Sequence, residues 1–98
     1  MSERSRIDKW LWHARFYRTR ARAQAAASSG LLRLNGARLE KASVGVQPGD
    51  IVTLPRGHEV VAVRIEAVAE RRGGATQAQK LYRLIETGDL LDRGEPAS

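Results

Sequence analysis

The chain has 98 residues, of which 42% are hydrophobic and 29% charged, so one globular domain with a single modest core is expected. It contains no cysteine, which excludes disulfides, thiolate catalysis and cysteine-ligated zinc. No run approaches the roughly 18 apolar residues that a membrane span needs, and the N-terminus lacks an apolar signal core. The sequence therefore predicts a cytoplasmic protein that does not contact membranes.

The basic charge is concentrated in the first part of the chain. Residues 1–41 carry ten basic and three acidic side chains, whereas residues 42–98 carry seven and eight, within a formal net charge of +6. Such a polarised field attracts polyanions, among which nucleic acid and acidic membrane surfaces are common. Arginine outnumbers lysine 14 to 3, which favours bidentate contacts with phosphates and bases.

A helical apolar pattern begins after a polar lead-in, residues 1–5, which we expect to be disordered. Its apolar residues recur at the i, i+3, i+4 and i+7 spacing of an amphipathic helix: Ile7, Trp10, Leu11 and Ala14. Ser5 is the expected N-cap, and Asp8 three residues later completes a variant of the capping box. Trp10 is expected in the core.

A second helix is predicted in the alanine-rich run after Thr19. Thr19 is its expected N-cap, and Gly30 suits the left-handed position at which helices end. The pattern breaks between Phe16 and Thr19, so we expect two short helices joined as a helical hairpin.

Short β-strands are predicted beyond the helices. Residues 31–34 and 38–39 flank Asn35-Gly36, the strongest two-residue hairpin signal in the chain. Pro48 and Gly49 occupy the positions that a type II turn prefers, and Asp50 is expected to cap that turn.

Two further strands are predicted over residues 51–54 and within residues 59–68, separated by a turn over residues 55–58. The second of these runs alternates β-branched with smaller or charged residues, as a half-exposed strand does. Thr76 can cap a last helix with Ala78, Leu81, Tyr82 and Ile85 on one face, although residues 81–85 also suit a final strand. Residues 87–98 are expected to form a frayed acidic tail.

Motifs for catalysis and for cofactor or metal binding are absent from the sequence. There is no HExxH, P-loop, GxGxxG or nucleophile-elbow sequence, and His13 and His58 lie far apart without a ligand pattern. His58 is better interpreted as an exposed turn residue than as a catalytic one. We therefore predict a protein that is not an enzyme, binds no small-molecule substrate and needs no cofactor or metal.

Nucleic-acid binding is the stronger hypothesis. Helical spacing places four basic or aromatic residues together, away from the apolar stripe: Lys9, Trp12, His13 and Phe16. Three arginines, Arg18, Arg20 and Arg22, continue the basic field around the hairpin. Such interleaving suits RNA, because cations meet phosphates while flat groups stack on bases. The competing interpretation is an ordinary solvated helix face, and for Trp12 we favour packing beneath the sheet or a terminal helix over base stacking.

The same residues resemble the RNA-binding domain named after ribosomal small-subunit protein four, and more closely the bacterial ribosome-associated heat-shock protein fifteen family. The similarity extends over about residues 6–86. It rests on Arg6-Ile7-Asp8-Lys9 with Leu11, Thr19-Arg20 with Ala23, Gly30 to Gly36, Ser43, and Pro48-Gly49-Asp50. The run Asp8 to Trp12, with Ala14 to Tyr17, is the more specific part. Departures from the family are Ala26-Ala27, where bulky apolar residues are usual, and the acidic end in place of a long basic extension.

The resemblance implies an α+β, αL-type RNA-binding fold, in which an N-terminal helical hairpin packs on a small antiparallel β-sheet. With the short C-terminal helix, residues 6–86 would form one domain whose αL hairpin core is residues 6–54. RNA phosphates would be met by seven cations: Arg6, Lys9, Arg15, Arg18, Arg20, Arg22 and Arg33. Trp12 and Phe16 are candidates for base stacking. Five residues would shape the motif, with Asp8 orienting an arginine: Asp8, Asn35, Gly36, Gly49 and Asp50.

Members of the resembled family bind free large ribosomal subunits that carry peptidyl-tRNA, which implies ribosomal RNA as the partner, in heat-shock or stalled-translation recovery. We expect a monomer. The alternatives are a DNA-binding or nucleoid-associated protein that uses the same basic hairpin, and a module whose basic face meets an acidic protein.

Overall fold

The computed structural model describes residues 4–85, so the predicted tail over residues 87–98 and most of the lead-in lie outside the described residues. In chain order the elements are β1 (Ser5–Arg6), α1 (Ile7–His13), α2 (Arg20–Ser28), β2 (Arg33–Leu34), β3 (Ala37–Arg38), β4 (Gly45–Val46), β5 (Ile51–Arg56), β6 (Glu59–Ile65), α3 (Ala75–Gln79) and β7 (Tyr82–Ile85).

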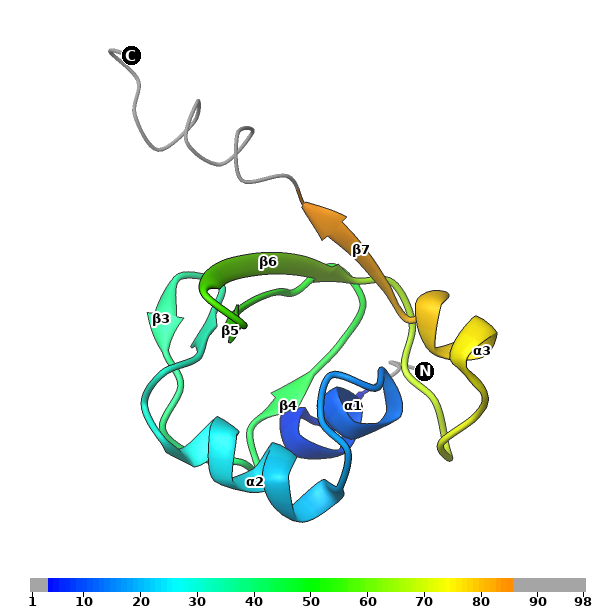
Figure 1. Ribbon diagram of the computed structural model, residues 1–98, viewed down its shortest axis with the longest axis horizontal. Helices are drawn as coiled ribbons and strands as arrows, with labels where there is room; N and C mark the ends of the chain where they lie inside the picture. Colours follow the sequence, from blue (N-terminus) through cyan, green and yellow to red (C-terminus); the bar gives the residue numbers. More distant parts are fainter. Residues whose placement is uncertain (1–3, 86–98) are drawn as a thin grey trace, which may run out of the picture.

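Five strands form one antiparallel sheet in the order β3-β2-β5-β6-β7, and β1 pairs with β4 separately. In Figure 1 the α1–α2 hairpin and β4 lie beneath one face of this curved sheet, with α3 beside the start of β7. The α+β prediction, with an N-terminal helical hairpin on an antiparallel sheet and a short C-terminal helix, is confirmed.

The apolar stripe of α1 forms the centre of the core. Ile7, Trp10 and Leu11 are fully buried, and they share one cluster with Val63 and Ile65 of β6. The indole Nε1 of Trp10 donates a 3.0 Å hydrogen bond to the carbonyl oxygen of Ala67, so its one polar atom is satisfied. Trp10 is therefore a core residue, as its spacing predicts.

The N-terminus of α1 is capped differently from the prediction. The N-cap residue is Arg6, with no side-chain capping bond, and the Ser5 hydroxyl donates only to the Arg6 carbonyl at 3.3 Å. The amides of Ile7 and Asp8 donate instead to the carbonyl oxygens of Val44 and Ala42, at 2.8 and 3.3 Å. Backbone carbonyls from a distant segment thus satisfy donors that a capping box would otherwise serve.

The second helix follows its prediction closely. The Thr19 hydroxyl accepts a 3.1 Å bond from the amide of Arg22, and Gly30 has φ +86° just beyond the helix end. Ala23 and Ala27 are fully buried. Of the two alanines that stand where the resembled family usually has bulky apolar residues, Ala27 is thus in the core and Ala26 is half-buried against it.

The turns follow local sequence. Asn35 and Gly36 have φ +52° and +87°, which is the type I′ geometry that this pair favours. Gly49 has φ +101°, and the Asp50 amide donates to the Gln47 carbonyl at 3.1 Å, as in a type II turn. The turn predicted over residues 55–58 is shorter, because Arg56 pairs with Glu59 and only Gly57 and His58 connect the strands.

The C-terminal region combines the two alternatives. The helix ends at Gln79, and its N-cap is Gly74 with no side-chain bond, so the predicted Thr76 cap is wrong. Residues 82–85 form β7 because pairing with β6, from Ala62↔Ile85 to Ile65↔Tyr82, satisfies their backbone groups. A longer helix through Ile85 would leave that edge of β6 unpaired.

Candidate nucleic-acid interface

The face predicted on the first helix is divided in the structure. His13 is only 1% exposed, so its placement on the outer face is wrong. The helix ends at His13, and Arg15 adopts φ +67°, which redirects the chain toward the core. Phe16 consequently packs against Trp10 and Tyr82, with ring centroids 6.0 and 4.7 Å apart.

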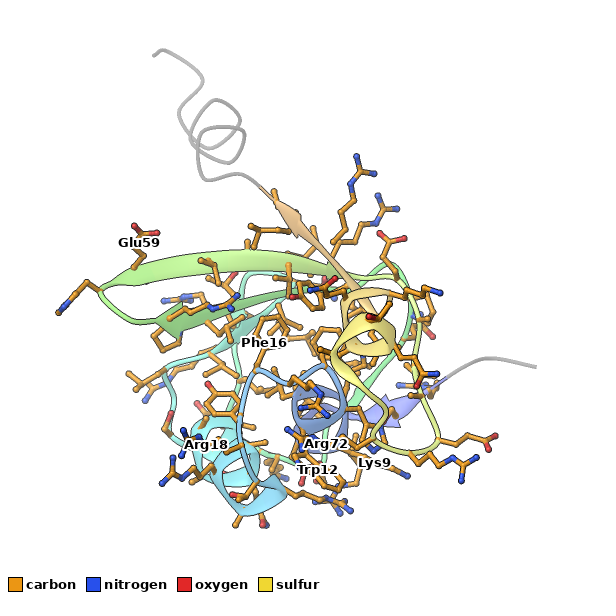
Figure 2. All side chains as sticks on the ribbon, turned by 45° about the vertical axis from the view of Figure 1, so that its right-hand side comes forward. Lys9, Trp12, Phe16, Arg18, Glu59 and Arg72 are labelled. Atoms are coloured by element: carbon orange, nitrogen blue, oxygen red, sulfur yellow. The ribbon has the colours of Figure 1, made fainter. Side chains whose placement is uncertain are left out.

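Trp12 remains at the surface, half-buried. Figure 2 shows Lys9, Trp12 and Arg72 in one region, while Phe16 points toward the sheet. The Arg72 guanidinium carbon lies 5.6 Å from the centroid of the Trp12 ring, and Arg72 Nε donates to the Trp12 carbonyl at 3.2 Å. Arg72 thus lies over Trp12, whereas Phe16 packs in the core and has the Arg56 guanidinium carbon 5.7 Å from its ring centroid.

Residues 67–73, which we call the strap, run along α1 through a series of hydrogen bonds. Ala67 accepts from Trp10, and the Ala69 carbonyl lies 3.2 Å from His13 Nδ1. The Gly73 carbonyl accepts from Arg15 Nη2 and Nε at 2.9 and 3.3 Å. The strap therefore fixes the direction of Arg15, and a neutral carbonyl leaves the charge of Arg15 uncompensated.

Burial determines the protonation of His13. Desolvation lowers its pKa from the ordinary 6.5, and the nearby cations Lys9, Arg20 and Arg72 lower the pKa further, against the hydrogen bond to Ala69. Because a carbonyl can only accept, Nδ1 carries the proton of the neutral ring. His13 is thus a structural link to the strap.

Arg6 is held by a buried carboxylate. Its Nε and Nη2 donate to Asp8 Oδ1 and Oδ2 at 3.1 and 2.9 Å, and Asp8 is 1% exposed, whereas 46% of the Arg6 side chain remains accessible. This bidentate pair orients the guanidinium and neutralises its charge. Arg6 therefore contributes a fixed donor more than net positive charge.

The cations of the turn and of α2 have no such partner. Arg18, Arg20 and Arg22 are exposed, and within residues 4–85 the Arg6–Asp8 contact is the only ion pair. We call these three residues the α2 surface. Three accessible guanidinium groups on one short segment, with no compensating carboxylate, supply the positive charge that attracts a polyanion.

The β2–β3 hairpin adds a second cluster. Arg33 pairs directly with Arg38 across the strands, and its Nη1 donates to the Gly36 carbonyl at 3.4 Å. A Cβ atom at Gly30 would collide with the Arg38 guanidinium, so Arg38 reaches the point where α2 ends. Arg38 was not among the predicted site residues; only the strand register reveals it.

Two of the predicted motif residues bind each other. Asn35 Nδ2 donates to Asp50 Oδ1 at 3.2 Å, and Asn35 Oδ1 accepts from the Ile51 amide at 2.8 Å. Asp50 Oδ2 also accepts from the Gln47 amide at 2.9 Å. These bonds join the Asn35-Gly36 turn to the turn that contains Gly49, and they fix the hairpin relative to β5.

Comparisons with known proteins agree with this geometry. The sequence model of the S4 domain matches residues 5–52. Heat shock protein 15 of Escherichia coli K12 is 37% identical over 92% of this chain, and its Haemophilus influenzae homologue is 40% identical over 84%. A structure titled as trimeric heat shock protein 15 of Vibrio cholerae superposes with a TM-score of 0.80 at 40% identity, covering 97% of this chain and 94% of that one.

The chain belongs to the heat shock protein 15 family. This membership confirms the resemblance seen in the sequence. The S4-domain proteins of this family are RNA-binding and non-catalytic. The chain spans 62% and 65% of the lengths of the Haemophilus and Escherichia proteins. The trimeric Vibrio structure does not support the monomer that we expected.

A Bacillus subtilis protein named RQC P-site tRNA stabilizing factor is a further relative of this chain. It is 34% identical over 87% of this chain and 96% of its own length. None of the helices that the structure describes is long and apolar enough to cross a membrane.

Proposed function

We propose that this protein binds ribosomal RNA of the large subunit in the cytoplasm, in a complex that includes peptidyl-tRNA, and that it acts in heat-shock or stalled-translation recovery. The observation that carries the proposal is the α2 surface, whose three exposed arginines have no carboxylate partner within residues 4–85. The names of the relatives, which refer to heat shock and to P-site tRNA, support the cellular context.

The residues divide into roles by their surroundings. The α2 surface supplies phosphate contacts, and Arg33 continues them on β2. Arg6 and Arg15 are already oriented by Asp8 and Gly73, so they lose less rotamer freedom on binding. Lys9 and Trp12 lie on α1, and the Arg72 guanidinium lies over the half-buried Trp12 ring, where a base can stack on the guanidinium plane or on the accessible part of the ring.

The test removes the α2 surface. The variant Arg18→Gln, Arg20→Gln, Arg22→Gln should lose co-sedimentation with large ribosomal subunits while its thermal unfolding stays unchanged, because all three side chains are exposed. For the wild type, log affinity for single-stranded RNA should fall with log salt concentration at about −0.7 per phosphate contacted. The matched control is the triple Arg→Lys variant, which keeps the charge but not the bidentate geometry and should therefore lose less affinity than the Gln variant.

Three outcomes would contradict the proposal. Unchanged binding by the Gln variant would show that the α2 surface is only solvated. A preference for duplex DNA over folded ribosomal RNA at physiological salt would favour the nucleoid-associated alternative. Loss of co-migration with ribosomal subunits in a lysate would favour an acidic protein partner.

A further inference from the structure

Two arginines face each other on the sheet, far along the chain from the α2 surface. Arg64 of β6 pairs directly with Arg83 of β7, and both are exposed. Their neighbours Val63, Ile65 and Tyr82 face the core, the first two fully buried and the third against Phe16. Because side chains alternate along a strand, Arg64 and Arg83 point to the opposite face of the sheet.

In Figure 1 the α1–α2 hairpin lies beneath the other side of β5 and β6. Arg64 and Arg83 are exposed, whereas Ala62 on the same face is buried. We call Arg64 and Arg83 the strand pair. Like charges directly opposite in an antiparallel sheet are destabilising, so the strand pair costs the fold free energy. Glu66 directly follows β6, two residues after Arg64, yet within residues 4–85 neither arginine forms an ion pair.

We propose that the strand pair is a second phosphate-binding site, through which the domain contacts an additional segment of RNA. The inference rests on the proposed RNA-binding function and extends it. Cβ atoms of directly paired residues lie about 4.5–5.5 Å apart, so both guanidinium groups can donate to the oxygens of one phosphate. The bound anion would remove the repulsion that the free protein carries.

The surroundings of the strand pair indicate backbone recognition, not base recognition. Ile51 lies opposite Arg64 on β5, and the next paired residues on this face are Ala62 and Ile85. These three side chains are apolar, and Thr53, which lies opposite Ala62, carries a hydroxyl on this face, so the strand pair itself has no aromatic or amide group beside it that would read a base edge. The contact is therefore independent of RNA sequence, and it holds an RNA segment on the face away from the helices.

The experiment compares Arg64→Gln/Arg83→Gln with the wild type on two RNA probes. For large-subunit ribosomal RNA, the variant should lose about tenfold in affinity, the loss of one charge-assisted contact, and its salt slope should become shallower by about 0.7–0.9. For an RNA stem-loop of one helical turn, the wild type should bind two copies and the variant one. Thermal stability of the variant should be unchanged or raised, because the substitutions remove the repulsion between the two arginines. A lower thermal stability would indicate a structural role for the pair.

The control is Lys41→Gln/Lys80→Gln, which removes two positive charges from exposed lysines elsewhere. It should stay within about twofold of the wild type, since screening limits distant charges. Equal losses in both double variants would overturn the site in favour of general electrostatic attraction. Retained affinity for purified RNA with lost binding to whole subunits would indicate an acidic ribosomal protein and would also overturn it.

Failure of this inference can be told apart from failure of the proposed function. The second site alone is refuted if three results are found together. The wild type would bind one stem-loop, the variant without the α2 surface would bind none, and the strand-pair variant would still bind one at wild-type affinity. If the wild type binds no RNA, the proposed function itself fails.

Discussion

His13 shows how a single buried residue makes stability depend on pH. Its pKa is lowered by burial from 6.5, so the folded protein keeps the ring neutral at a pH where the unfolded chain takes up a proton. Above pH 6.5 both states are neutral and the stabilising contribution is fully present. It is lost as the pH falls from 6.5 through the pKa of the folded state.

We therefore expect the free energy of unfolding to decrease on acidification below pH 6.5, by at most about 1.4 kcal/mol per pH unit for one proton. His13→Asn retains a donor near the position of Nδ1 but cannot titrate. Urea denaturation from pH 7.5 to 5 should show a steeper decline for the wild type than for this variant. Parallel curves would mean that His13 does not control the effect.

At the scale of elements, the connection between α2 and β2 depends on one glycine. Gly30 has φ +86°, a conformation that side chains other than glycine disfavour, and a Cβ there would displace the Arg38 guanidinium. We expect Gly30→Ala to reduce the free energy of unfolding by about 1–2 kcal/mol. The measurement is chemical denaturation monitored by circular dichroism.

Gly74 provides the matched control. It has φ −74° and open space around its Cβ position, so Gly74→Ala meets no steric strain. The lower entropy of the unfolded chain should offset the lower preference for Ala at this N-cap, so stability should change by less than about 0.5 kcal/mol. If the two variants lose equal stability, backbone conformation at Gly30 is not the cause. A Gly30→Ala/Arg38→Ala double variant separates the conformational cost from the displacement of the guanidinium.

For the whole molecule, the predictions that hold are those that neighbouring residues decide. Thr19, Asn35-Gly36 and Gly49 follow from chemistry within a few residues, and α1 follows from its own periodicity. The wrong ones depend on distant partners. Ser5 loses its capping role to carbonyls of the segment before β4, and the predicted last helix is cut short by pairing with β6.

The candidate site divides in the same way. The α2 surface is readable as a run of arginines, and its contact with RNA remains a prediction. Phe16 was assigned to the wrong face because the spacing assumes that the helix continues past His13. Arg72, docked on Trp12, and the Arg64–Arg83 pair become visible only through a contact 60 residues apart in the chain and through strand register.

These long-range contacts also predict which part of the chain can fold alone. A fragment of residues 1–56 contains the S4 match and the predicted αL core, but it lacks β6, the strap and β7. Trp10 would then lose its hydrogen bond to Ala67 and its packing in one cluster with Val63 and Ile65. Each large core truncation typically costs about 2–5 kcal/mol, so losing several costs as much as the roughly 5–15 kcal/mol by which a whole domain is stable.

We expect this fragment to show no cooperative thermal transition and poor dispersion in amide NMR spectra, whereas residues 1–85 should unfold cooperatively. Burial of Trp10 gives an independent measure, because its fluorescence should shift to longer wavelength in the shorter fragment as the indole becomes exposed to water. Trp12→Phe in both fragments leaves Trp10 as the single indole and makes the comparison specific. A cooperative transition in the 1–56 fragment would show that the α1–α2 hairpin and β5 suffice for folding. The strap would then only orient side chains such as Arg15 at the surface.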